Sequence, residues 1–102
     1  MSQNVTDETF PDFIRHPVAV LSFSSPWCAA CKKVLAHAEG MEQAYGAIIF
    51  GTMDISTSPN TPAQFQVFSI PTVIFFKNGS EVNRLSGTIT DTELRKGLDT
   101  LV

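Results

Sequence analysis

The chain has 102 residues, with ten acidic against seven basic side chains and a formal charge of −3 at pH 7. This length supplies one hydrophobic core, so a single domain over residues 1–102 is expected. With 43% hydrophobic and 17% charged residues, the composition excludes a disordered chain. The acidic balance argues against a nucleic-acid partner, because phosphate binding needs a basic surface. The longest apolar-rich run, at 18–23, is far below the roughly 20 residues that span a bilayer, so no membrane partner is expected.

Cysteine usage points to a reducing compartment. The chain has two cysteines, Cys28 and Cys31, and both lie in one Cys-x-x-Cys motif. A disulfide-stabilised secreted protein usually spreads more cysteines along the chain to join distant segments. The first ten residues are polar and acidic, without the basic and apolar regions of a signal peptide, so a cytoplasmic protein is expected. The pair closes too small a loop to stabilise the fold much, so its interest is chemical.

Hydrophobic periodicity predicts helices and strands in alternation along the first half of the chain. A short strand is a candidate at 4–6, and a short helix is expected within 6–15. The nearly continuous apolar run at 18–23 predicts a buried parallel strand, and a second buried strand is expected over 47–54. Between them, good helix formers predict a helix over about 28–45. Its apolar face is formed by four side chains at helical spacing: Val34, Leu35, Ala38 and Met41.

The next segments predict a short helix and a hairpin. Thr61 is a candidate N-cap for a short helix that has Pro62 in its first turn. Residues 72–77 predict a strand, and the Asn-Gly pair at 78–79 is the strongest two-residue hairpin signal in the chain. The alternating residues 81–85 predict a half-exposed antiparallel strand after that turn.

A last helix completes the predicted fold. Gly87 breaks the preceding strand, and either Thr90 or Asp91 can cap a helix that buries Leu94, Leu98 and Leu101. The eight phenylalanines are expected overwhelmingly in the core. The order of elements predicts an α/β fold of three layers, α/β/α, around a central mixed sheet.

The Cys-x-x-Cys motif lies where a buried strand is followed by a helix. Unpaired N–H groups and the helix dipole at a helix N-terminus stabilise a thiolate, so the pKa of Cys28 is expected to be lowered. Cys31 lies one turn later, close enough to attack a mixed disulfide formed at Cys28. The spacing therefore predicts a redox pair in which Cys28 attacks and Cys31 resolves. A structural or idle pair is the plain alternative.

Zinc binding is a weaker alternative. Beyond the cysteines and carboxylates, only His16 and His37 are available as ligands, and neither has the spacing of a zinc finger. No metal site is therefore expected, and His37 is expected to be an exposed or partly buried side chain on the helix.

Together, these residues resemble the thioredoxin family along nearly the whole chain. The resemblance is carried by five segments: Trp27-Cys28-Ala29-Ala30-Cys31-Lys32, Met53-Asp54, Ser69-Ile70-Pro71-Thr72, Phe76-Lys77-Asn78-Gly79 and Gly87. The family implies the thioredoxin fold, with a sheet of four or five strands, and dithiol–disulfide exchange with protein substrates.

The resemblance also implies a substrate-binding surface. It implies a cis bond between Ile70 and Pro71, which leaves the backbone before the proline free to pair with an extended substrate. By the same resemblance, Trp27, Ile70, Pro71 and Gly87, with Thr88 as a further candidate, form a shallow apolar rim that docks the substrate.

Three departures from the family pattern affect the chemistry. The family usually has Gly-Pro between the cysteines, where this chain has Ala29-Ala30, so the reduction potential is not carried over. A buried carboxylate that serves the resolving cysteine in the family is matched by Ser22, which is left as a candidate proton relay. A lysine that commonly accompanies that carboxylate is matched by Phe50, so both partners of a buried charge pair are replaced together.

The sequence thus predicts a cytoplasmic protein-disulfide oxidoreductase that reduces its substrates and is recycled by a reductase of the thioredoxin-reductase type. No cofactor is implied, and a monomer is expected. An oxidase or isomerase is the alternative within the same chemistry, and a non-catalytic binding module is the alternative from another class.

Overall fold

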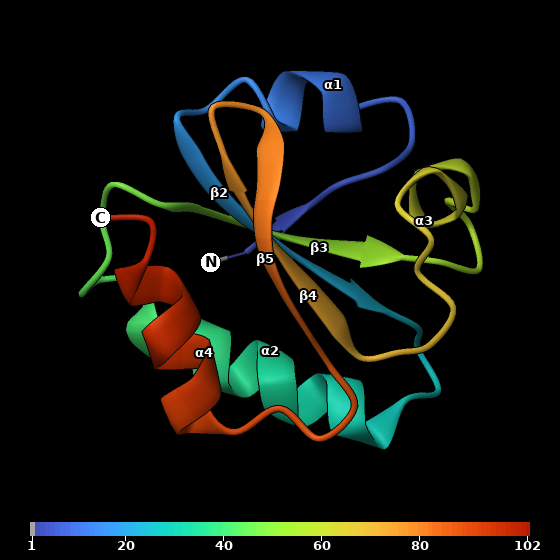
Figure 1. Ribbon diagram of the computed structural model, residues 1–102. Helices are drawn as coiled ribbons and strands as arrows, with labels where there is room; N and C mark the ends of the chain where they lie inside the picture. Colours follow the sequence, from blue (N-terminus) through green and yellow to red (C-terminus); the bar gives the residue numbers. More distant parts are fainter. Residues whose placement is uncertain (1) are drawn as a thin grey trace.

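A five-stranded mixed sheet organises the computed structural model, which describes residues 2–102 (Figure 1). The elements in chain order are β1 (Gln3–Asn4), α1 (Phe10–Phe13), β2 (Val18–Ser24), α2 (Ala29–Met41), β3 (Ile49–Asp54), α3 (Asn60–Gln64), β4 (Thr72–Lys77), β5 (Ser80–Ser86) and α4 (Asp91–Asp99). The strand order is β1-β3-β2-β4-β5. Strands β1, β3 and β2 are parallel, β4 is antiparallel to β2, and β5 is antiparallel to β4. Helices α2 and α4 lie side by side on one face, and α1 and α3 lie on the other (Figure 1). This is the predicted three-layer α/β arrangement.

Strand β2 is buried along its whole length because it lies at the centre of the sheet. Successive side chains of a strand point to opposite faces. Val18 and Val20 therefore belong to the core under α2 and α4, whereas Ala19, Leu21 and Phe23 belong to the core under α1. At the C-terminal end of β2, Ser22 and Ser24 lie on the same face as Val18 and Val20.

Local sequence signals explain the hairpin and the last helix. Asn78 and Gly79 both have positive φ, at 52° and 83°, as a tight two-residue hairpin turn requires. Thr90 is the N-cap of α4 and forms a capping box with Glu93, so it and not Asp91 caps the helix. The three predicted leucines are buried: Leu94, Leu98 and Leu101.

Four element boundaries differ from the sequence prediction. Helix α2 ends at Met41, well before Tyr45, because Gly40 weakens its last turn and the chain continues as successive turns up to β3. The following strand therefore begins at Ile49 and not at 47. The first strand is Gln3–Asn4, and β5 is longer and more exposed than predicted because it is the sheet edge.

The short helix α3 is capped from a distant part of the chain. The carboxylate of Asp7 accepts hydrogen bonds from the N–H groups of Asn60 and Thr61, at 3.0 and 2.8 Å, and from the Thr61 hydroxyl at 2.8 Å. Thr61 is therefore inside the helix, and the prediction that it serves as the N-cap is wrong. The cap residue itself is Pro59, which has no side-chain acceptor.

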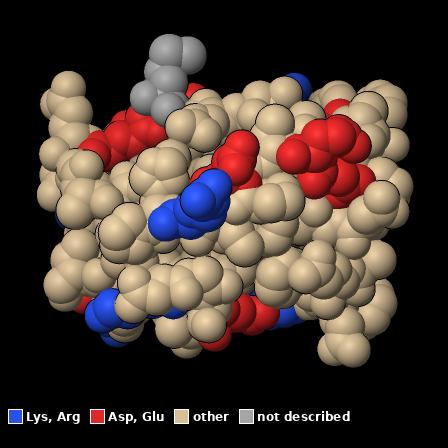
Figure 2. All heavy atoms as spheres, turned by 90° about the horizontal axis from the view of Figure 1, so that it is seen from above, with Lys and Arg blue, Asp and Glu red and all other residues tan. Residues whose placement is uncertain are grey.

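Charged side chains are dispersed over the surface. Figure 2 shows the end of the molecule that carries α1, where small groups of acidic and basic side chains lie among neutral ones and one basic group adjoins an acidic group. Within residues 2–102, no helix has the length and apolar character needed to cross a membrane.

Candidate active site

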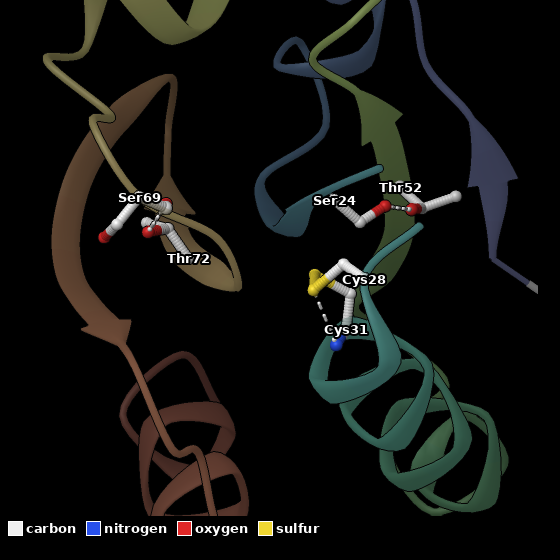
Figure 3. Close-up of a disulfide and its surroundings, with 6 residues drawn as sticks. All are labelled: Ser24, Cys28, Cys31, Thr52, Ser69 and Thr72. Carbon is white, nitrogen blue, oxygen red and sulfur yellow. Dashed lines mark hydrogen bonds between the residues drawn. A yellow bond between two sulfur atoms is a disulfide. The ribbon is translucent and has the colours of Figure 1, made fainter. Parts of the chain in front are cut away.

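The two cysteines form a disulfide at the start of α2 (Figure 3). Cys28 is the N-cap residue, with extended backbone, and its sulfur accepts a hydrogen bond from the Cys31 N–H at 3.1 Å. The helix begins here because the turn at 25–28 closes through a hydrogen bond from the Cys28 N–H to the Ser25 carbonyl. The first helical residues, Ala29 and Ala30, have high helix propensity.

The two sulfur-bearing residues differ in exposure. Cys28 is half-buried, whereas Cys31 is only 1% exposed. An incoming sulfur atom can therefore reach Cys28 but not Cys31. The N–H of Cys31 already points at the Cys28 sulfur, which is the geometry that stabilises a thiolate at a helix N-terminus. This arrangement supports one accessible sulfur that attacks and one enclosed sulfur that closes the disulfide.

The loop before β4 lies beside the disulfide. The Ile70–Pro71 bond is cis, as the family resemblance implies. The Pro71 carbonyl accepts a hydrogen bond from the Gly87 N–H at 3.2 Å, and the Thr72 hydroxyl donates to the Ser69 carbonyl at 2.7 Å. Figure 3 shows Ser69 and Thr72 on one side of the disulfide, and strands β2 and β3 on the other.

Four predicted rim residues come from three segments that meet at this place. Trp27 is 81% exposed next to Cys28, Ile70 is partly buried, and Pro71 is buried. Gly87 is exposed and has a φ of +79°, a conformation that glycine adopts without strain. Thr88 is also exposed, and it lines a groove of about 380 Å³ together with Ala30, Lys33 and Gly87.

Ser22 is buried on the face of the sheet that α2 covers. It pairs in register with Thr52 of β3 and Val73 of β4. Its hydroxyl makes no hydrogen bond to another residue in the described part of the chain. Phe50, at the position that would carry a lysine, is 4% exposed and packs in the core with Val20.

A pair of hydroxyl groups that sequence analysis did not single out lies beside Ser22. The side-chain oxygens of Ser24 and Thr52 are 3.4 Å apart (Figure 3). They line a cavity of about 270 Å³ together with Lys32 and Asp54. The Asp54 carboxylate accepts hydrogen bonds from the N–H and hydroxyl of Ser56, at 2.9 and 2.6 Å, so it holds the turn after β3.

His37 lies on α2 with its Nδ1 atom 3.5 Å from a carboxylate oxygen of Asp91, and the side chain is 38% exposed. It thus joins α2 to the start of α4. Among residues 2–102, no three histidine, cysteine or acidic side chains are grouped so that they could hold a metal ion.

Two further residues near the site were not predicted from the sequence. Phe68 is 89% exposed, so it is the exception to the expectation that the phenylalanines lie overwhelmingly in the core. Arg84 of β5 donates hydrogen bonds to the carbonyls of Phe65 and Gln66, at 2.7 and 3.4 Å. The uncharged segment 65–73 could have drawn attention to Phe68, but the contact of Arg84 with it has no sequence signal.

Both the sequence and the structure of the chain are similar to those of known proteins. The thioredoxin family model matches residues 1–100. Thioredoxin from Staphylococcus saprophyticus is 37% identical over 84 residues, which cover 81% of each chain, and thioredoxin from Chlamydia caviae is 34% identical over 87 residues, 85% of each. Oxidised mitochondrial thioredoxin 3 from Saccharomyces cerevisiae has a similar structure, with a TM-score of 0.89, 27% identity, and coverage of 97% of this chain and 94% of that one. The chain therefore belongs to the thioredoxin family, whose members are thiol–disulfide oxidoreductases.

Proposed function

We propose that this dithiol–disulfide oxidoreductase reduces protein disulfides, with Cys28 as the nucleophile and Cys31 as the resolving thiol. The Cys28 thiolate attacks a substrate disulfide, which forms a mixed disulfide and releases one substrate thiolate. The Cys31 thiolate then attacks the Cys28 sulfur, breaks the mixed disulfide and releases the second substrate thiolate. The substrate gains two electrons, and the protein is left with its Cys28–Cys31 disulfide. The difference in exposure between the two cysteines carries this assignment.

The rim around Cys28 is the proposed docking surface for the substrate. Trp27, Ile70 and Gly87 are exposed or partly exposed and offer apolar contact and accessible backbone beside the reacting sulfur, and Pro71 is buried next to Ile70. A polypeptide in an extended conformation fits such a surface because its main chain can pair with the loop before β4.

Ser22 is the proposed proton relay for Cys31. The Cys31 thiol must lose a proton before it attacks, and both residues are buried. Ser22 lies on the sheet face that α2 covers, and a hydroxyl can accept one proton while it donates another. The partnered hydroxyls of Ser24 and Thr52 extend this polar strip toward the cavity beside β3.

The proposal includes an electron donor and a compartment. A partner of the thioredoxin-reductase type supplies two electrons to the Cys28–Cys31 disulfide after each turnover. A reducing compartment such as the cytoplasm suits a chain whose two cysteines both belong to the redox motif. The protein is proposed to act as a monomer, with residues 1–102 as one domain.

Reduction of insulin disulfides by the protein and two single variants tests the assignment of the cysteines. Cys28→Ser and Cys31→Ser should each abolish turnover, but only Cys31→Ser should trap a mixed disulfide with the substrate, visible by mass spectrometry. Trapping by Cys28→Ser alone would reverse the two roles. Unchanged turnover in Cys28→Ser would remove the catalytic proposal in favour of a binding module.

The reduction potential distinguishes a reductant from an oxidant. Equilibration with dithiothreitol buffers should give a value near or below about −270 mV for a cytosolic reductant of the thioredoxin type. A value between about −120 and −200 mV would instead favour the oxidase or isomerase function. A difference of about 30 mV in reduction potential corresponds to a tenfold change in the equilibrium constant of this two-electron exchange.

A further inference from the structure

We propose that Phe68 determines substrate specificity by binding a large apolar side chain that flanks the reacting cysteine of an extended protein substrate. This inference rests on the proposed function, because it concerns the same docking surface. It adds a residue outside the predicted rim and states the chemistry of the substrate that the residue selects.

The exposure of Phe68 is the first observation. Its side chain is 89% exposed, more than that of Trp27 at 81%, although phenylalanine is a residue type that proteins usually bury. Within residues 2–102, the other large apolar side chains that are exposed are Val82 on the edge strand and Val102 at the end of the chain. Two exposed aromatic rings therefore belong to the segments that adjoin the disulfide.

The position of Phe68 along the chain places it within reach of a docked substrate. Phe68 precedes Ile70 by two residues, so their Cα atoms lie within about 7 Å of each other. The next residue, Ser69, is one of those that surround the disulfide in Figure 3. A substrate strand that pairs with the Ile70 backbone extends about 10 Å to each side over three residues, which is long enough to reach the position of Phe68.

The loop that carries Phe68 is fixed at both ends, so the ring is held outward. The Arg84 guanidinium binds the Phe65 carbonyl at one end of the loop, and it is itself held by two hydrogen bonds of 2.7 Å to Glu81. The Val67 N–H bonds to the Pro62 carbonyl at 2.8 Å, and the Thr72 hydroxyl binds Ser69 at the other end. An aromatic ring that is exposed on a fixed loop loses little conformational freedom on binding.

The charge pattern identifies the kind of partner. Three segments meet at the disulfide, 24–31, 65–73 and 85–90, and none of them contains an acidic, basic or histidine residue. Charged side chains begin outside them, at Lys32, Arg84 and Asp91. Arg84, which binds this loop, is already paired with Glu81, so a charged substrate residue beside Phe68 would find no unpaired counter-ion and would lose hydration. A leucine or phenylalanine would instead bury apolar area against the ring. The occupant is therefore an apolar residue of the substrate strand.

A peptide series tests this inference. Each peptide has one cysteine, joined as a mixed disulfide to thionitrobenzoate, in a background of serine and alanine. A single leucine is moved through about three positions on either side of the cysteine, the span of one docked strand. Release of coloured thionitrobenzoate by the reduced protein gives kcat/KM for each peptide.

One leucine position should raise kcat/KM about three- to tenfold over the all-serine peptide, through a lower KM. Phe68→Ser should remove that gain, and Phe68→Leu should retain most of it. Val82→Ser is the matched control, because it also removes an exposed apolar side chain. Val82 lies near the start of β5, at the opposite end of the strand from Gly87, so the increase in kcat/KM from leucine should persist. Reaction with the small disulfide dithiobis(nitrobenzoate) should be equal in all these proteins, which confirms that fold and thiol chemistry are intact.

The inference would be overturned if leucine raised kcat/KM as much in Phe68→Ser as in the unchanged protein. It would also be overturned if no leucine position raised kcat/KM in the unchanged protein. Either result leaves the proposed function in place as long as the peptides are reduced and Cys28→Ser is inactive. If the unchanged protein reduces neither the peptides nor the small disulfide, the proposed function fails and this inference fails with it.

Discussion

Ser22 lies in the middle of the sheet, where the chemistry of a single side chain affects both stability and catalysis. It is 6% exposed, and its neighbours in register are Thr52 and Val73. Phe50, one pleat away on the same face, is an apolar core residue. The position therefore accepts a neutral hydroxyl, but nothing in the core beside it would neutralise a carboxylate.

Ser22→Asp should destabilise the protein in a pH-dependent way. Burial will raise the pKa of the new carboxyl group above its value of about 3.9 in the unfolded chain. The penalty is then absent below that value and grows as the pH rises toward the folded pKa. Relative to the isosteric Ser22→Asn, Ser22→Asp should lose about 1–3 kcal/mol of unfolding free energy at neutral pH and almost none at about pH 4.

Urea unfolding of both variants at the two pH values measures this difference. An equal difference at both pH values would show that the carboxyl group keeps its charge or reaches solvent. That outcome would contradict a buried site without a cationic partner.

At the scale of the elements, two helical glycines should respond in opposite directions to the same substitution. A Cβ atom at Gly97 of α4 would lie under 3 Å from the buried ring of Phe75, whereas a Cβ atom at Gly40 of α2 would meet nothing within 4 Å. Gly97→Ala should lose about 1–3 kcal/mol because the core is overpacked. Gly40→Ala should gain about 0.5–1 kcal/mol from helix propensity.

Thermal and urea unfolding of the two glycine variants provide the comparison, and each variant is the control for the other. A gain in stability for Gly97→Ala would mean that α4 can move away from β4 at no cost. Helix α4 would then be held less tightly against the sheet than its buried leucines imply.

The cap of α3 should contribute to stability at neutral pH. Burial acts to raise the pKa of Asp7, but hydrogen bonds from the Thr61 N–H, the Asn60 N–H and the Thr61 hydroxyl outweigh it, so the pKa is lowered. A group with a lowered folded pKa stabilises the protein above its unfolded pKa, and the contribution is lost as the pH falls through the folded value. Asp7→Asn keeps one acceptor oxygen and removes the charge, so it should cost up to about 1 kcal/mol at pH 7, less than the loss of a whole cap.

Asp12→Asn is the matched control for the Asp7 variant. Asp12 is 87% exposed and lies 3.7 Å from Arg15, an exposed pair for which no measurable change is expected. The difference between Asp7→Asn and the unchanged protein should disappear in strong acid. A difference that persists there would assign the stabilisation to packing and not to the charged cap.

The Asp7 cap also shows where sequence analysis of this chain stops. Elements set by neighbouring residues were predicted correctly: the buried run of β2 and the Asn-Gly turn. The cap of α4 was predicted at Thr90 or Asp91, and the structure assigns it to Thr90. The contact between Asp7 and Thr61 joins residues 54 positions apart, so no local pattern reveals it. The end of α2 was missed because the predicted helix ran past Gly40, although the low helix propensity of glycine is a local signal for the end.

The candidate site was predictable to a similar extent. The Cys-x-x-Cys motif is a local segment, and its two cysteines form the disulfide. The rim residues come from separate segments, two of which are joined by the hydrogen bond from Gly87 to Pro71, and their role in docking stays a prediction. Phe68 was missed because its residue type favours the core, and its exposure results from contacts that fix the loop at both ends. The hydroxyl pair of Ser24 and Thr52 depends on the register between β2 and β3, which cannot be predicted from local sequence patterns.

At the scale of the whole molecule, the segments that form the proposed docking surface are uncharged, and the groove beside them contains side chains of opposite charge, Lys33 and Asp91. The protein has a net charge of −3, yet the three segments that meet at the disulfide contain no ionisable side chain other than the cysteines. The opposite charges of Lys33 and Asp91 largely cancel at a substrate docked beside Gly87, and charges more than about 10 Å away are screened at 0.1 M salt. Association should therefore depend on apolar contact and main-chain pairing, with little electrostatic steering.

Reduction of a neutral thionitrobenzoate peptide should accordingly be almost independent of salt. We expect kcat/KM to change less than about twofold between roughly 0.05 and 0.5 M sodium chloride. Thr88→Lys places a charge on the exposed rim beside Gly87 and supplies the positive control. This variant should reduce an acidic peptide faster at low salt and lose that advantage at high salt. If the unchanged protein shows a steep salt dependence with the neutral peptide, charges outside the three segments direct binding, and the docking surface extends beyond the uncharged rim.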